Sequence, residues 1–114
     1  MTFERQFVVT KLNELDGYAE ELNEFLTRDD VAILKNIESV RAVERVFQLA
    51  VDAMLDINKY LINELSLAVP EDFQSTFYTL GENNVLPKEF AGKIAPIVGL
   101  RNRIVHGYET VNKK

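Results

Sequence analysis

The sequence predicts an all-α fold, and two observations support that prediction. Apolar side chains recur at steps of three and four residues along most of the chain, the spacing that places them on one face of a helix. No segment shows the strict apolar-polar alternation that marks a half-buried strand. A chain of 114 residues is typical of one domain, and it buries roughly two-thirds of its unfolded surface. We therefore expect a single domain over residues 1–114, a bundle of about four to five helices.

The apolar spacing delimits the first two helices. It predicts a first helix from about residue 3 to 26. Residues 27–30 supply side chains that cap helix N-termini, and the same spacing then continues to Leu65. We expect a long second helix from about 31 to 65, with residues 36–39 as the place where it could break.

Proline and glycine residues delimit a short third helix. Pro70, followed by Glu71 and Asp72, fits a first helical turn. The N–H groups of this turn have no partner within the helix, so the N–H that proline lacks is not missed. Acidic side chains are favourable there because the N-terminal end of a helix is positive. Gly81 can end this helix through a left-handed C-cap. Residues 82–84 then continue the turn chemistry.

A fourth helix, from about 88 to 106, is expected after Pro87. Pro96 lies inside it, lacks a backbone donor and crowds the preceding turn, which predicts a kink. Gly107 is a good helix stop, so that Tyr108 need not lie opposite His106.

The composition excludes several kinds of site. The chain has no cysteine and one histidine, and it shows no close cluster of metal-ligating residues, so we expect neither a metal nor a cofactor. It also lacks a glycine-rich phosphate loop and a serine-nucleophile motif. The N-terminus lacks a secretory pattern, and no apolar run approaches the roughly 20 residues that span a bilayer. We expect a cytoplasmic protein that has no membrane contact.

Charge is unevenly distributed. The net charge of −5 argues against broad nucleic-acid binding, but residues 86–114 carry six basic and two acidic side chains, a local balance of +4. Lys93 and Arg103 lie in this segment and are candidates for RNA contact. Alternatively, both signs of charge lie on solvated helix faces without a binding role.

The same basic segment holds Arg101-Asn102-Arg103-Ile104-Val105-His106-Gly107-Tyr108, an Arg-x4-His-x-Tyr string. On a helix, Asn102 and His106 share a face. Arg101 lies about 140° from His106 around the helix axis, so its long side chain must extend back toward His106. An imidazole can move protons at neutral pH and a guanidinium can bind a phosphate in two contacts, so these groups could cleave RNA without a metal.

Less specific interpretations of these residues remain open. A lone histidine in a helical protein is usually a packing or surface residue, and Tyr108 taken alone is more often a core ring. Asp52 and Asp56, within the otherwise apolar segment 49–57, could orient the motif from across a cleft. Solvent exposure on the opposite helix face is the stronger expectation for both.

Segment 99–108 resembles the hallmark of the HepT-like toxins of the HEPN superfamily, in which an arginine and a polar residue precede His-x-Tyr. Arg41 to Ile57 is similar to the family's long second helix. Phe73 to Pro87 is similar to its segment that ends in a Leu-Pro turn. One departure is that six residues follow Tyr108, where the family commonly continues with a further helix.

The resemblance implies a homodimer of HEPN fold that acts as a metal-independent endoribonuclease. It implies the toxin of a type II or type VII toxin–antitoxin system, neutralised when an MntA-like nucleotidyltransferase antitoxin adds AMP. Arg101 and His106 would be catalytic, Asn102 would be the supporting polar residue, and Tyr108 would accept AMP. Single-stranded or looped RNA is the expected substrate.

A second hypothesis comes from another functional class. The chain would be a non-catalytic helical module that binds a nucleotidyltransferase partner or a nucleotide. In this hypothesis Arg101 and Tyr108 would contact phosphate and base. Cleavage of RNA by the purified protein separates the two hypotheses.

Overall fold

The computed structural model is all-helical over the residues it describes, 4–27 and 35–112, with side chains described up to Gly107. In this part of the chain the helices are α1 (Arg5–Leu26), α3 (Ile37–Glu64), α4 (Gln74–Glu82), α5 (Lys88–Ile94) and α6 (Ile97–Asn112). The predicted fold class is therefore confirmed.

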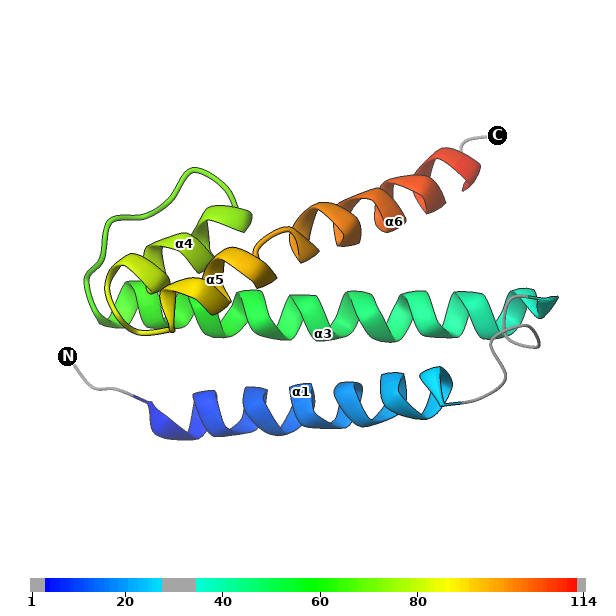
Figure 1. Ribbon diagram of the computed structural model, residues 1–114, viewed down its shortest axis with the longest axis horizontal. Coiled ribbons are helices and arrows are strands. Elements are labelled where there is room, and N and C mark those ends of the chain that lie inside the picture. Colours follow the sequence, from blue (N-terminus) through cyan, green and yellow to red (C-terminus); the bar gives the residue numbers. More distant parts are fainter. Residues whose placement is uncertain (1–3, 28–34, 113–114) are drawn as a thin grey trace.

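The long helix α3 is the axis of the bundle (Figure 1). Its 28 residues extend about 42 Å, most of the 49 Å length of the molecule. Figure 1 shows α1 antiparallel to α3 along one side, whereas α4, α5 and α6 lie on the other side. α6 runs back along α3 and diverges from it toward its C-terminal end.

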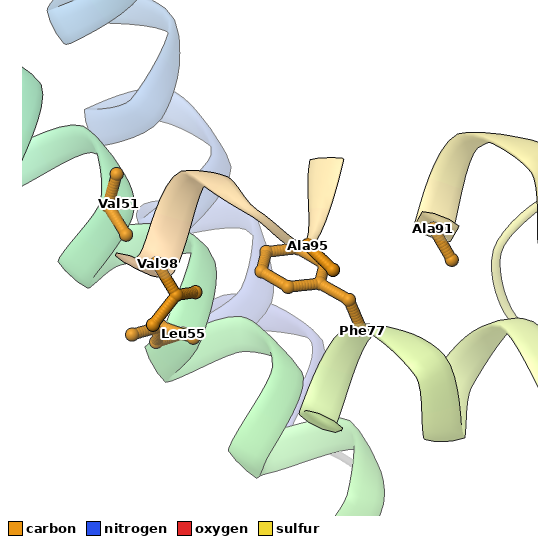
Figure 2. Packing of buried hydrophobic residues seen from close by; sticks show 6 residues of the cluster. All are labelled: Val51, Leu55, Phe77, Ala91, Ala95 and Val98. Atoms are coloured by element: carbon orange, nitrogen blue, oxygen red, sulfur yellow. The ribbon is translucent and has the colours of Figure 1, made fainter. Parts of the chain in front are cut away.

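The fully buried core lies between α3 and the three C-terminal helices. One cluster joins two residues of α3 with residues from α4 onward: Val51, Leu55, Phe77, Ala91, Ala95 and Val98 (Figure 2). α1 contributes no fully buried residue. It packs instead through half-buried contacts, among them a stack of Phe7 on Tyr60 with ring centroids 4.7 Å apart.

The first helix ends at Leu26 as predicted, but the second prediction is partly wrong. α3 begins at Ile37 because Asn36 has extended backbone angles, φ −105° and ψ 106°, and caps the helix. Its side-chain oxygen accepts hydrogen bonds from the backbone N–H of Glu38 and Ser39, at 3.0 and 3.2 Å. The break expected at 36–39 is therefore confirmed, and one continuous helix from residue 31 is excluded. Positions 28–30 of the expected cap lie outside the described residues.

The prediction for the third helix is corrected at both ends. α4 begins at Gln74, after the Pro70–Asp72 segment that was expected to form its first turn. The Asp72 carboxylate accepts a hydrogen bond from the Ser75 backbone N–H at 2.8 Å, and that bond lowers the pKa of Asp72. Gly81 is helical and is no C-cap, because the left-handed residue after this helix is Asn84, with φ 61°.

Gly81 serves close packing instead. A Cβ atom at this position would lie 2.8 Å from the Cβ of Ala91, so the missing side chain lets α4 and α5 approach each other. Both residues are buried. Gly81, which the sequence suggested as the end of a helix, thus lies in the contact between α4 and α5.

The kink expected at Pro96 is a break between two helices, α5 ending at Ile94 and α6 beginning at Ile97. The expected stop at Gly107 is wrong, because α6 continues through it to Asn112. A glycine inside a helix costs only about 1 kcal/mol relative to alanine, which the rest of the helix can offset. No helix among the described residues has the length and apolarity needed to cross a membrane.

We predict that Gly81→Ala destabilises the protein by about 1–3 kcal/mol, the usual cost of overpacking a well-filled contact. Gly17→Ala is the matched control, since a Cβ there meets no atom within 4 Å. This control should stabilise α1 by about 0.5–1 kcal/mol through helix propensity. Urea denaturation followed by circular dichroism measures both. A Gly81→Ala variant at least as stable as the parent would contradict the packing role.

Candidate active site

α6 carries the Arg-x4-His segment, and the burial of Val98 fixes the rotation of this helix. Val98 is 2% exposed and belongs to the core cluster with Val51 and Leu55 of α3. One turn later, the half-buried Arg101 lies on nearly the same face. The Arg101 side chain is directed toward α3, where Asp52 pairs with it, whereas Asn102, Arg103 and His106 are exposed.

Arg101 forms an ion pair with Asp52 of α3. The Arg101 Nε donates to Asp52 Oδ1 at 3.0 Å, and the two side chains are 24% and 37% exposed. The expectation that Asp52 lies on a solvated opposite face is therefore wrong. The alternative, an acidic residue that faces the Arg-x4-His segment, is the arrangement found.

Asp56 lies one turn further along α3 and has different partners. Its carboxylate pairs with Lys11 of α1 at 3.1 Å and with Lys59 at 3.9 Å. The hydrogen bond from Lys11 to Asp56 raises the pKa of Lys11. Asp56 thus connects α3 to α1, whereas Asp52 connects α3 to α6.

Asn102 lies between Arg101 and a surface hollow. Its side-chain oxygen accepts a hydrogen bond from Arg101 Nη1 at 3.3 Å. The hollow has a volume of about 470 Å³ and is lined by Glu71, Asp72, Phe73, Gln74, Val98 and Asn102. Sequence reasoning did not identify the segment before α4 as a neighbour of Asn102, because that contact depends on how α4 and α6 pack.

The other residues singled out from the sequence are spread around α6 and α5. His106 and Arg103 are exposed on α6, and Lys93 of α5 forms an exposed ion pair with Glu89 at 3.2 Å. Position 108 lies within α6, about 200° around the helix axis from position 106, and its side chain is outside the described residues. In the described part of the chain no three His, Cys, Asp or Glu side chains gather where they could hold a metal ion.

The sequence matches the family described as "Ribonuclease HepT-like" over residues 15–114. The chain belongs to this HepT-like family. A protein named "tRNA nuclease HepT" from Aphanizomenon flos-aquae (strain 2012/KM1/D3) is 33% identical over 107 residues, which cover 92% of this chain and 71% of that protein. The "mRNA nuclease HepT" of Shewanella oneidensis is 23% identical over 104 residues, 91% of this chain and 70% of that protein.

A solved structure named "Crystal structure of the toxin-antitoxin with AMP-PNP" has the same fold as this HepT-like chain. The TM-score is 0.81 at 20% identity, over 90% of this chain and 76% of that one. The all-α architecture and the family resemblance expected from segment 99–108 are therefore both confirmed. Arg101, Asn102, His106 and Tyr108 remain the residues predicted for the site.

Proposed function

We propose that this chain is a toxin ribonuclease whose catalytic residues are Arg101 and His106. The observation that carries the proposal is the placement of both residues on α6 of a HepT-like protein, with His106 exposed and Arg101 anchored at the α3–α6 contact. Two relatives that span most of the chain are named as nucleases, one of tRNA and one of mRNA, which supports RNA as the substrate.

The chemistry of these two side chains suits cleavage by the ribose 2′-hydroxyl. An imidazole, whose ordinary pKa is about 6.5, can accept or donate a proton at neutral pH. The guanidinium of Arg101 can stabilise the charge that builds up on the phosphate in the transition state. We infer that the reaction is metal-independent, with Asn102 supporting Arg101 and with exposed Lys93 and Arg103 contacting the RNA backbone.

We also propose that the active form is a homodimer. Positions 101 and 106 are about 140° apart around one helix, so a second copy of α6 would bring further donors and a second imidazole to the same phosphate. Leu100, Arg103 and Gly107 follow each other at steps of three and four on the outward face of α6. Leu100 is 43% exposed, and Gly107 permits close approach of a second helix.

A nucleotidyltransferase antitoxin that attaches AMP to Tyr108 is our proposal for the regulation of this toxin. A structure of the same fold is named as a toxin–antitoxin with AMP-PNP, which supports a nucleotide-using partner. Position 108 follows Arg101 by two helical turns, about 10.5 Å along the axis, and lies within about 20° of it around the axis. A phosphate attached there adds negative charge on the Arg101 side of α6. We also propose that the toxin acts in the cytoplasm, where tRNA and mRNA take part in translation.

We predict that Arg101→Ala and His106→Ala each lower RNA cleavage at least about 100-fold, the usual effect of removing a proton-transfer or transition-state group. Total tRNA and an mRNA transcript, incubated with the full chain in EDTA, are the substrates. Lys59→Ala is the control, because Lys59 pairs with Asp56 on another part of the bundle and should keep parental activity. Full activity in His106→Ala would contradict the mechanism. Failure of the parent to cut either RNA would favour the non-catalytic binding module.

We predict that the parent protein is a dimer by light scattering at micromolar concentration and that Leu100→Glu shifts it toward monomer. The added carboxylate would be taken out of water at the α6–α6 contact, and this desolvation can cost more than an ion pair with the neighbouring Arg103 returns. Cleavage should fall together with the dimer. Val69→Glu is the matched control, because Val69 is 86% exposed in the segment between α3 and α4. A monomeric parent, or a monomeric Leu100→Glu variant with full activity, would rule out the dimeric site.

We predict that co-expression with the cognate nucleotidyltransferase adds AMP to Tyr108 and blocks RNA cleavage. Tyr108→Phe should escape modification and keep much of the nuclease activity, since a phenol with a pKa of about 10 is a poor proton donor at neutral pH. Peptide mass spectrometry locates the AMP. Modification confined to Tyr18, Tyr60 or Tyr78 would refute the proposal, as would RNA cleavage by fully modified protein.

A further inference from the structure

The contact between Asp52 and Arg101 joins two helices across 49 positions of sequence. It places a carboxylate oxygen 3.0 Å from the guanidinium that the proposed function makes catalytic. We propose that Asp52 is a positioning residue, which holds Arg101 ready for the scissile phosphate and does not itself touch the RNA. This inference rests on the proposed ribonuclease activity.

The N–H groups of Arg101 are shared between contacts within the protein and groups that are left for a phosphate, which suits this role. A guanidinium has five N–H groups. Among the described residues, Asp52 takes the Nε–H and Asn102 takes one N–H on Nη1, so three N–H groups remain on the two terminal nitrogens. These three are enough for two parallel contacts with a phosphate, the geometry that arginine favours. Asp52 thus binds the Nε–H of the guanidinium and leaves N–H groups of the terminal nitrogens for RNA.

Positioning matters because arginine is a long and flexible side chain that loses rotamer freedom when it binds. Arg101 is anchored before RNA arrives, since Val98 fixes the rotation of α6 and Asp52 fixes the guanidinium. A group that is held in place in advance needs no rearrangement as charge develops in the transition state. The contribution of Asp52 should therefore be found in kcat.

The negative charge of Asp52 has the opposite effect on substrate binding. A carboxylate beside the phosphate site repels RNA in the ground state, so its removal should leave KM unchanged or lower it. A residue that only stabilised the fold would give a different result, a lower melting temperature with no selective loss of kcat. The kcat and KM values therefore separate the two roles.

Asp56 provides a matched control on the same helix. It is 40% exposed, close to the 37% of Asp52, and it forms an ion pair of similar length with Lys11, 3.1 Å against 3.0 Å. Its partners are lysines of α1 and α3, and Arg101 is not among them. Both pairs are partly exposed, and such pairs contribute little to stability. Removal of either carboxylate should therefore leave the protein folded.

The test measures steady-state cleavage of total tRNA and of an mRNA transcript in EDTA by four full-length proteins. Asp52→Ala should lower kcat at least about 10-fold, the effect of a misplaced catalytic group, with KM unchanged or lower. Asp52→Asn keeps an oxygen that can accept the Arg101 Nε–H, so its kcat should stay within about threefold of the parent. Asp56→Ala should also stay within about threefold, the scale of a surface substitution.

Several results would overturn the proposal. The first is an Asp52→Ala variant that keeps the parental kcat. The second is an equal loss of kcat in Asp52→Asn and Asp52→Ala. The third is a loss of kcat in Asp56→Ala as large as that in Asp52→Ala, together with a lower melting temperature.

If the parent cuts neither RNA, the proposed function fails, and the nitrogen-15 NMR signal of the Arg101 Nε–H still tests whether Asp52 positions Arg101. This signal, assigned by its absence in Arg101→Ala, should be protected from solvent exchange in the parent and unprotected in Asp52→Ala. Protection that persists in Asp52→Ala would overturn the proposal.

Discussion

The rest of the structure depends on the burial of Val98 against α3, directly after the break at Pro96. Because proline cannot continue the hydrogen-bond ladder, α5 and α6 are separate helices that can pack independently. α5 contacts α4 through the Gly81–Ala91 approach, whereas α6 contacts α3 through Val98. One break therefore lets a short C-terminal segment complete the core and direct a second helix along α3 (Figure 1).

Neighbouring side chains of α6 lie in different environments. Arg101 is half-buried against α3, where Asp52 accepts its Nε–H. Asn102 and His106 follow Val98 at steps of four residues and are exposed. Arg101 is thus half-buried and paired, while the other two residues of the proposed site are exposed. Core packing, and no special loop, prepares the proposed site.

Much of the fold could be predicted from the sequence because periodicity and proline act locally. The end of the first helix and the interruption at Pro96 follow from these signals. The glycines were less informative, because a glycine can end a helix, permit close packing or simply be tolerated within a helix. Gly81 permits close packing beside Ala91, and Gly107 is tolerated within α6. Which of these occurs depends on tertiary contacts. The sequence named Asp52 and Asp56 as carboxylates that could orient the motif, but it favoured solvent exposure for both, because only the packing of α6 on α3 brings Asp52 to Arg101.

The arrangement around Arg101 also bears on how an acidic protein could have the proposed phosphate-binding role. A net charge of −5 disfavours strong, unspecific attachment to RNA, and one of the negative charges, that of Asp52, lies beside Arg101. Both features weaken binding of the ground state. In the proposed mechanism the guanidinium of Arg101, held in place by Asp52, offsets this repulsion most where charge accumulates on the phosphate, and only stabilisation that is stronger in the transition state accelerates the chemical step. For the proposed ribonuclease, which would act on many RNA molecules and release each one, such selective stabilisation is of more use than tight binding.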